Sequence, residues 1–349
     1  MNQMNKKLLL AVFSILLISF SLFYINYFEK KDQNDLNTTL LTHSSVTPNT
    51  ATPDSKRLVY IVSDLRIPFW SIMAKGIEKH AVSLGYRIDI YSAENDPKKE
   101  LEFAAKALKE NVSGIIISPT TSSACATILK LAKHSGIPVV ISDIGTDGGE
   151  YVSYISSNNR EGAYQIGMVL AHELQKKGWG KSEIAIIAIP QKRLNGQERT
   201  AGFMQAMNES GIKNSDIRQQ ATFSYEETYI YSKELINNNP KLRALWLQGS
   251  DRYQGALDAI RDSGKKDQIL LLTFDAEPEF LQLIPKGILV GSAMQQPYLM
   301  GEQSVQVMVD HLHHKPVEKN IKLPVLAISS ENIKENMALI ERNVMGVND

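Results

Sequence analysis

The sequence predicts an α/β fold made of two lobes, each built on a parallel sheet. Residues 58–64 (LVYIVSD) form a short apolar run without the alternation of a half-exposed strand, which is typical of parallel strands covered on both faces. Segments whose apolar residues recur at helical spacing separate this run from others like it. The alternation starts again after residues 154–156, so we expect a second lobe and a ligand cleft between the two.

Residues 58–91 are expected to form a strand, a loop, a helix and a second strand. Apolar residues continue at helical spacing from Phe69 to Leu84, and Gly85 follows them as a stop signal. Loop 64–70 then lies at the C-terminal end of a strand, the edge at which open α/β sheets bind ligands. We interpret Phe69 and Trp70 as a ligand surface, the alternative being that they pin the helix to the sheet.

The rest of the chain is expected to continue the alternation. In the first lobe the expected elements are a helix begun by Asp96-Pro97, strand 114–118, helix 124–133 and strand 139–142, which stops at Asp143. In the second lobe they are helices 159–177, 198–208, 226–238 and 254–262, and strands 183–189, 220–223, 244–248 and 269–274. Strand 289–294 and helix 298–313 follow, and Asp275 ends its strand as Asp143 does.

Composition excludes several classes of partner. The 349 residues include 38 Lys+Arg and 38 Asp+Glu, so the net charge of +0 gives no long-range field to attract nucleic acid or anionic lipid. Cys125 is the single cysteine, which excludes an intrachain disulfide and predicts a small buried residue. No G-x-S-x-G motif or Gly-rich phosphate loop is present, so we expect neither an enzyme nor a bound cofactor.

The N-terminus carries a targeting signal. Lys6-Lys7 and the apolar run 8–28 predict a signal peptide or a membrane anchor over residues 1–28, followed by a flexible Thr-, Ser-, Asn- and Pro-rich linker over 29–56. Residues 19–21 form a mediocre cleavage site, and the aromatic end of the run resembles an interfacial belt, so both alternatives stay open. The folded part is expected in a bacterial periplasm or at the outer face of the cytoplasmic membrane.

From about residue 56 to residue 330 the chain resembles bacterial periplasmic sugar-binding proteins of the ribose-binding type. The matching segments, in order, are IPFWSIMAKGIEKHAVSLGY, AEND, GIIISPTTSSA, GIPVVISD, ISSNNREGAYQIG, GQERTAGF, GAL, LLTFDAEPE and AMQQPYLMG. The resemblance implies two Rossmann-like lobes joined by three hinge crossings around one ligand. It places residues 57–158 plus about 296–323 in the N-terminal lobe, and residues 159–295 plus about 324–349 in the C-terminal lobe.

The resemblance also implies a set of ligand-binding residues. Aromatic rings would stack on the ligand, carboxylates would accept hydrogen bonds from its hydroxyls, and a hinge amide would add a polar partner. In this chain these residues are Phe69, Trp70, Phe223, Asp143, Asp275 and Gln295. We count Gln197 and Arg66 as further candidate ligand-binding residues. No metal is implied, because His311, His313 and His314 are explained as cationic residues at a helix C-terminus.

The sequence departs from the family at several polar positions. Ile67 stands where an Asn is usual, Ile144 and Gln197 stand where Arg is common, and Gly249 or Ser250 stands where an Asn is common. A pocket with these changes is not expected to hold ribose in the family's way.

Two arginines leave the class of ligand open. Arg66 and Arg193 near the expected cleft mouth offer an alternative site for a carboxylate or phosphate, or are solvated surface residues.

The expected function is capture of a small sugar-like molecule by hinge closure and its delivery to an ABC permease by a monomeric protein. The alternative is presentation of the bound ligand to a membrane histidine kinase or chemoreceptor. Repressors that share the fold carry an N-terminal helix-turn-helix, and here the apolar segment and linker occupy that position.

Overall fold

The structure, a computed structural model, describes residues 54–347. The expected signal or anchor segment 1–28 and most of the expected linker lie outside the described residues, but residues 54–56 belong to the first strand rather than to a linker. Over residues 54–347 no helix combines the length and the apolar character needed to cross a membrane.

The first lobe is built on a six-stranded sheet in which every neighbouring pair of strands is parallel. The strand order is β11-β5-β4-β3-β1-β2. The strands are β1 (Asp54–Val62), β2 (Arg87–Ser92), β3 (Val112–Ser118), β4 (Val139–Ser142), β5 (Ser153–Ser157) and β11 (Asn320–Leu323).

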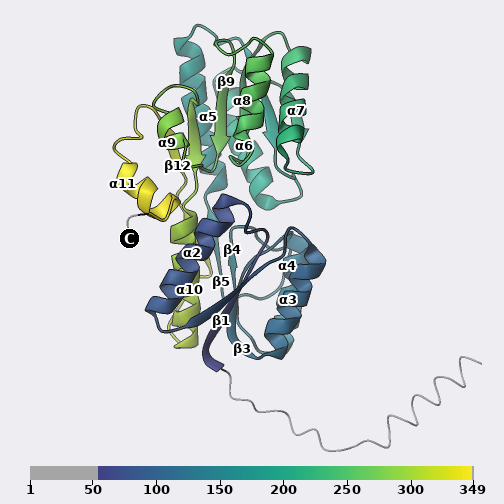
Figure 1. The fold of residues 1–349 in the computed structure, drawn as a ribbon, viewed down its shortest axis with the longest axis vertical. Coiled ribbons are helices and arrows are strands. Elements are labelled where there is room, and N and C mark those ends of the chain that lie inside the picture. The colour runs from purple at the N-terminus through teal and green to yellow at the C-terminus, as the bar shows by residue number, and fades with distance from the viewer. Residues whose placement is uncertain (1–53, 348–349) are drawn as a thin grey trace, which may run out of the picture. The chain divides into compact units, whose positions relative to one another are not determined.

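Helices cover both faces of this sheet (Figure 1). Helices α2 (Pro68–Ser83) and α10 (Pro297–Leu312) pack on one face, and α3 (Pro97–Lys109) and α4 (Ser122–His134) pack on the other. Alternate residues of β1 point to the two faces, with Tyr60 toward α2 and α10 and Ile61 toward α3 and α4. This two-sided burial is why the strand reads as a continuous apolar run. Cys125 lies on the buried face of α4, as predicted.

The second lobe repeats the plan with the strand order β12-β10-β9-β8-β6-β7. The strands are β6 (Glu183–Ala188), β7 (Lys213–Gln219), β8 (Leu242–Leu247), β9 (Leu270–Phe274), β10 (Gly291–Met294) and β12 (Leu326–Ser329). The edge pair β10 and β12 is antiparallel, unlike the other pairs and unlike the fully parallel sheet that was expected.

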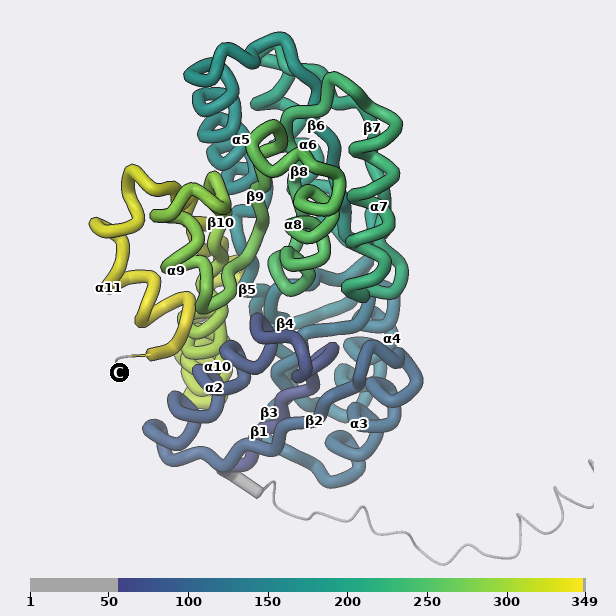
Figure 2. Tube along the Cα trace, turned by 45° about the horizontal axis from the view of Figure 1, so that its top comes forward, coloured from purple at the N-terminus to yellow at the C-terminus, as the bar shows by residue number. Residues whose placement is uncertain are grey.

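The helices of the second lobe also form two layers. Helices α5 (Asn159–Lys176) and α6 (Leu194–Glu209) cover one face, and α7 (Tyr225–Asn238), α8 (Tyr253–Asp262) and α9 (Phe280–Leu283) cover the other. The C-terminal segment, with α11 (Met337–Leu339) and the π-helix η1 (Ile340–Val344), passes beside α9 in Figure 2. It also contacts α10, where Arg342 pairs with Glu302.

The chain crosses between the lobes three times, which confirms the predicted fold class. It leaves the first sheet after β5, returns between β10 and α10, and leaves again between β11 and β12. Gln295-Gln296 occupies the second crossing and Pro324-Val325 the third.

Three local expectations were wrong. Residues 220–223 are a loop, and the strand of this region is Lys213–Gln219. It lies at the edge of the sheet, so its exposed positions carry polar residues and its sequence lacks the apolar run of a buried strand. Phe69 and Trp70 belong to the first turn of α2 rather than to a loop, because Pro68 occupies the first helical turn. Helix α6 begins at Leu194, one turn earlier than residue 198.

Candidate functional site

Side chains that directly follow the strands gather where the two lobes meet. Asp143 follows β4 of the first lobe, and Asp275 follows β9 of the second. Arg193, just before α6, donates a hydrogen bond from Nη2 to the backbone oxygen of Thr120 in the first lobe at 3.2 Å. The charges of Arg199 and Asp275, in the second lobe, both shift the pKa of Asp143 in the first lobe. The charged groups at the two sheet edges therefore interact with one another.

Asp143 is almost fully enclosed, with 2% of its surface exposed. Burial raises its pKa to about 6, Arg199 opposes that rise, and the nearby Asp275 adds to it. Its Oδ1 has no hydrogen-bond partner among the described residues. The backbone oxygen of Asp143 accepts a hydrogen bond from Tyr154 Oη at 2.7 Å, which fixes the turn while leaving the carboxylate available.

Asp275 is held by partners from its own lobe. Gln295 donates a hydrogen bond from Nε2 to Asp275 Oδ1, and Arg199 Nη1 lies 3.6 Å from Asp275 Oδ2. Burial raises the pKa of Asp275, and Arg199 opposes the rise. Gln295 is 2% exposed, and its Oε1 has no partner within residues 54–347. Two buried acceptor atoms, on Asp143 and Gln295, are therefore open to a donor.

Arg199 is a residue of the site that we did not predict. It is 3% exposed and donates to Asn159 Oδ1 at 2.8 Å and to the backbone oxygen of Gln248 at 2.7 Å. Its guanidinium carbon lies 3.8 Å from the centre of the Phe274 ring. A signal was present, because Arg199 falls on the helical stripe that includes Phe203 and is otherwise buried.

The aromatic residues divide between the core and the lobe edge. Trp70 is 6% exposed and packs in the core of the first lobe, where it meets Phe69 edge to face at a centroid distance of 4.8 Å. Phe69 is only partly buried against that core. Phe223 is half-buried, and the Arg193 guanidinium carbon lies 5.8 Å from its ring centre. Ligand stacking on these three rings remains a prediction.

Arg66 and Gln197 are engaged within their own segments. Arg66 has 70% of its side chain exposed and donates to both carboxylate oxygens of Asp64, at 2.8 Å and 2.7 Å. This pairing lowers the pKa of Asp64 against the opposing effect of burial. Gln197 is exposed and donates to the backbone oxygen of Gln191 at 2.9 Å. Their roles in binding remain predictions.

Two buried acids support the loops of the site and were also not predicted. Glu100 accepts hydrogen bonds from the backbone nitrogen of Thr120 at 2.7 Å and from its hydroxyl at 2.9 Å, and burial raises the pKa of Glu100 to about 7. Glu277 accepts from Ser250 Oγ at 2.8 Å, and burial raises its pKa to about 7 as well. Glu100 thus fixes the loop that receives Arg193.

Comparison with known proteins matches this architecture. A family model described as a periplasmic binding protein domain matches residues 58–316. The ribose import binding protein of Bacillus subtilis is 30% identical over 264 residues, which are 76% of this chain and 84% of that protein.

Two solved structures show the same fold. A carbohydrate transporter solute-binding protein from Agrobacterium radiobacter in complex with D-arabinose is 22% identical, with a TM-score of 0.76 over 83% of this chain and 98% of that chain. A periplasmic solute-binding protein of an ABC transporter from Actinobacillus succinogenes, with bound D-allose, is 18% identical, with a TM-score of 0.75 over 80% of this chain and 99% of that chain. On the family match and the Bacillus relative, the chain belongs to the periplasmic binding protein family.

Proposed function

We propose that this protein binds one small neutral sugar or sugar-like polyol between its lobes. The observation that carries the proposal is the pair of buried acceptors, Asp143 Oδ1 and Gln295 Oε1, that find no donor among the described residues. An unmade hydrogen bond on a buried polar atom costs about 1–3 kcal/mol, so a ligand that supplies donors would recover that free energy. Sugar hydroxyls supply such donors, whereas a carboxylate or phosphate mainly supplies acceptors.

The cationic groups near the site support a neutral ligand over an anionic one. Arg66 is paired with Asp64, Arg199 lies between Gln248 and Asp275, and Arg193 donates to Thr120. An anion would have to displace these partners. The relatives named for ribose, and the solved structures with D-arabinose and D-allose, point to the same class of ligand.

Ribose itself is a less suitable ligand for this site than neutral sugars and polyols are as a class. Ile144, which stands where the family commonly has Arg, is 1% exposed and packs in the core of the first lobe. An apolar side chain there cannot bind a ligand hydroxyl, so one polar anchor of the family is missing. We therefore infer a pentose, hexose or cyclitol whose hydroxyl pattern differs from that of ribose.

The proposal includes closure of the lobes around the ligand. The lobes would comprise residues 57–158 plus about 296–323, and residues 159–295 plus about 324–349. Asp143 and Asp275 follow strands of different sheets, so a ligand bound to both links the lobes. We further propose that the protein works as a monomer in the periplasm, or at the outer face of the membrane, binding rather than transforming its ligand.

A thermal-shift screen tests the ligand class. Pentoses, hexoses, inositols, small carboxylates and sugar phosphates would be added to the purified protein, because a ligand that binds only the folded state raises its melting temperature. We expect a neutral polyol to give the largest shift. The shift should be lost in the double variant D143N/D275N and kept in the control E335Q, an exposed carboxylate of the second lobe. A larger shift with an acid or phosphate would contradict the proposal.

Delivery to an ABC importer is the proposed use of the bound ligand. Uptake of the labelled polyol by a deletion strain would measure it, and we expect uptake to fall. Normal uptake together with a lost transcriptional or swimming response would instead support presentation of the ligand to a histidine kinase or chemoreceptor.

A further inference from the structure

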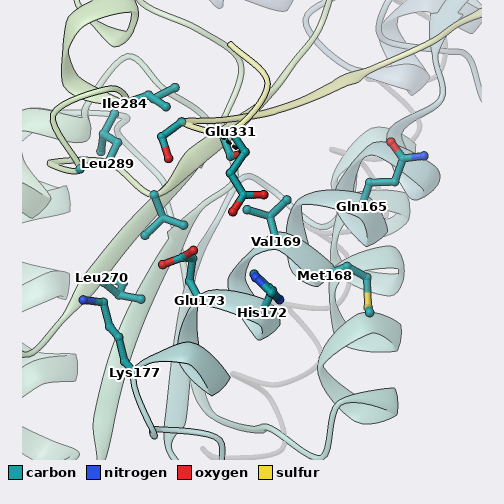
Figure 3. Close-up of a pocket in the computed structure, with 14 residues that line it drawn as sticks. Gln165, Met168, Val169, His172, Glu173, Lys177, Leu270, Ile284, Leu289 and Glu331 are labelled. Carbon is teal, nitrogen blue, oxygen red and sulfur yellow. Dashed lines mark hydrogen bonds between the residues drawn. The ribbon is translucent and has the colours of Figure 1, made fainter. Parts of the chain in front are cut away.

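A cavity of about 390 Å³ lies in the second lobe, away from the candidate ligand site, beside α5 and the segment that follows β12. Three potential metal ligands line it. His172 and Glu173 lie near the end of α5, and Glu331 is two residues past β12 (Figure 3). The figure shows the two carboxylates and the imidazole directed toward a common space between these elements.

The spacing of these donors suits one small cation. Each side chain offers one ligand atom, and the three atoms lie within 4.8 Å of one another. Metal–ligand bonds of about 2.0–2.2 Å place neighbouring donors roughly 3–4 Å apart. Side-chain rotation alone can close the remaining gap, because His172 and Glu331 are exposed and Glu173 is half-buried.

Contacts within the protein neutralise only part of the negative charge of His172, Glu173 and Glu331 taken together. Within the described part of the chain, the side chains of His172 and Glu331 make no hydrogen bond or ion pair, and Glu173 has only Lys176, at 3.4 Å. Lys177 lines the same cavity, but its ammonium lies 5.5 Å from the centre of the Trp179 ring. Two carboxylates thus converge with an imidazole, the Glu331 carboxylate has no ammonium partner within residues 54–347, and a divalent cation would balance the remaining negative charge.

We propose that His172, Glu173 and Glu331 bind a divalent transition-metal cation. One imidazole and two carboxylates form a donor set that Zn²⁺ accepts readily, and water would complete the tetrahedral coordination. The cation would join the end of α5 to the segment beyond β12, two elements far apart in the sequence. Its role is structural, because His172 lies thirteen residues, or roughly 20 Å of helix, beyond the start of α5 near Arg199.

Calorimetric titration of the purified, metal-free protein with Zn²⁺ tests this site. We expect one Zn²⁺ per chain, a higher melting temperature with Zn²⁺, and weaker binding of Mn²⁺ in line with the usual order of divalent-metal affinity. The variants H172A and E331Q should each bind Zn²⁺ at least tenfold more weakly. The variant H313A, which removes an exposed histidine of the first lobe, is the matched control and should bind normally.

The outcome separates this site from the proposed sugar site. Far-UV circular dichroism would confirm that the variants fold, and their affinity for the polyol should equal that of the parent protein. Absence of saturable Zn²⁺ binding would overturn the metal site, and so would equal Zn²⁺ affinity in H172A, E331Q and the parent protein. Loss of sugar binding in H172A would contradict the separation of the two sites.

Discussion

Asp143 and Asp275 share a backbone conformation that few residues other than glycine adopt. Their φ angles are 65° and 69°, in the left-handed region, and each residue directly follows a buried strand. Phe223, at φ 53°, is the third candidate site residue in this region, and for a bulky side chain the conformation is costlier. Aspartate tolerates this region better than most residues do, so the backbone strain is greatest at Phe223, which lies in the loop after β7.

Ligand affinity should depend on the charge of Asp143. Because its pKa is raised to about 6, the carboxylate is charged at neutral pH and gains a proton as the pH falls through 6. Ligand hydroxyls donate to the charged form, so we expect affinity to fall between pH 7 and pH 5. D143N should weaken binding about tenfold to a hundredfold at pH 7, since hydrogen bonds to charged groups contribute about 1.5–3 kcal/mol. Calorimetry across this pH range, with E335Q as the control, would show it. Equal affinity in D143N and the parent protein would remove Asp143 from the site.

Trp70 should affect stability more than Phe69 does. Trp70 is 6% exposed within the core of the first lobe, and truncating a buried Trp typically costs about 3–5 kcal/mol. Urea denaturation of W70A should show a loss of this size, with a smaller loss for the partly buried Phe69 in F69A. If W70A were as stable as the parent protein but unable to bind ligand, the ring would belong to the site rather than to the core.

At the scale of helices, α2 and α10 approach closely because each has a glycine at the contact. A Cβ on Gly76 would lie 2.4 Å from the backbone oxygen of Tyr298, and a Cβ on Gly301 would lie 2.4 Å from that of Met73. Backbone atoms cannot rotate away, so a methyl group at either position would separate the helices. This contact sets the position of α2, whose first turn carries Phe69 and Trp70.

Substitution of Gly301 tests this packing. G301A should lower the free energy of unfolding by about 1–3 kcal/mol, because overpacking outweighs the gain in helix propensity. Urea denaturation would measure the change. The control is G148A, where a Cβ would meet no atom within 4 Å. A more stable G301A would show that the helices can separate at little cost.

The sequence predicted those elements whose residues are buried on both faces. Strands such as β3 and β8 were found because sandwiched parallel strands are apolar throughout. Strand β7 was misplaced because it is a polar edge strand. Strands β11 and β12 were not expected because they are short and, unlike the equally short β4, include exposed or only partly buried residues. Local patterns carry little information about such strands, whose pairing depends on distant partners.

The candidate site was predictable to a similar degree. The position of Asp143 and Asp275 directly after their strands was predicted, because the order of elements defines the C-terminal edge of a parallel sheet, while their role in binding stays a prediction. Arg199 and Glu100 could not be placed in the same way, because their partners lie about 40 and 20 residues away, at Asn159 and Thr120. Trp70 was interpreted as a ligand surface with packing of the helix on the sheet as the alternative, and the local sequence could not show that its ring is 6% exposed within the core of the first lobe.

At the scale of the whole molecule, binding depends on how often the lobes are closed without ligand. Arg193 donates to Thr120 across the lobes at 3.2 Å, a contact that opening would break. If the closed state is only partly populated, the apparent affinity falls in proportion to that population. Arg193 therefore stabilises the closed state without needing to touch the ligand.

Replacing Arg193 should shift this equilibrium. We expect R193A to bind the polyol about tenfold more weakly, since a hydrogen bond from a charged donor contributes about 1.5–3 kcal/mol. Small-angle scattering should show a smaller radius of gyration with saturating ligand in both proteins, and a larger radius for ligand-free R193A than for the ligand-free parent. The control is K192A, which alters the exposed neighbouring residue. Identical scattering with and without ligand would exclude closure, whereas weaker binding with an unchanged ligand-free radius would mean that Arg193 contacts the ligand instead of holding the lobes.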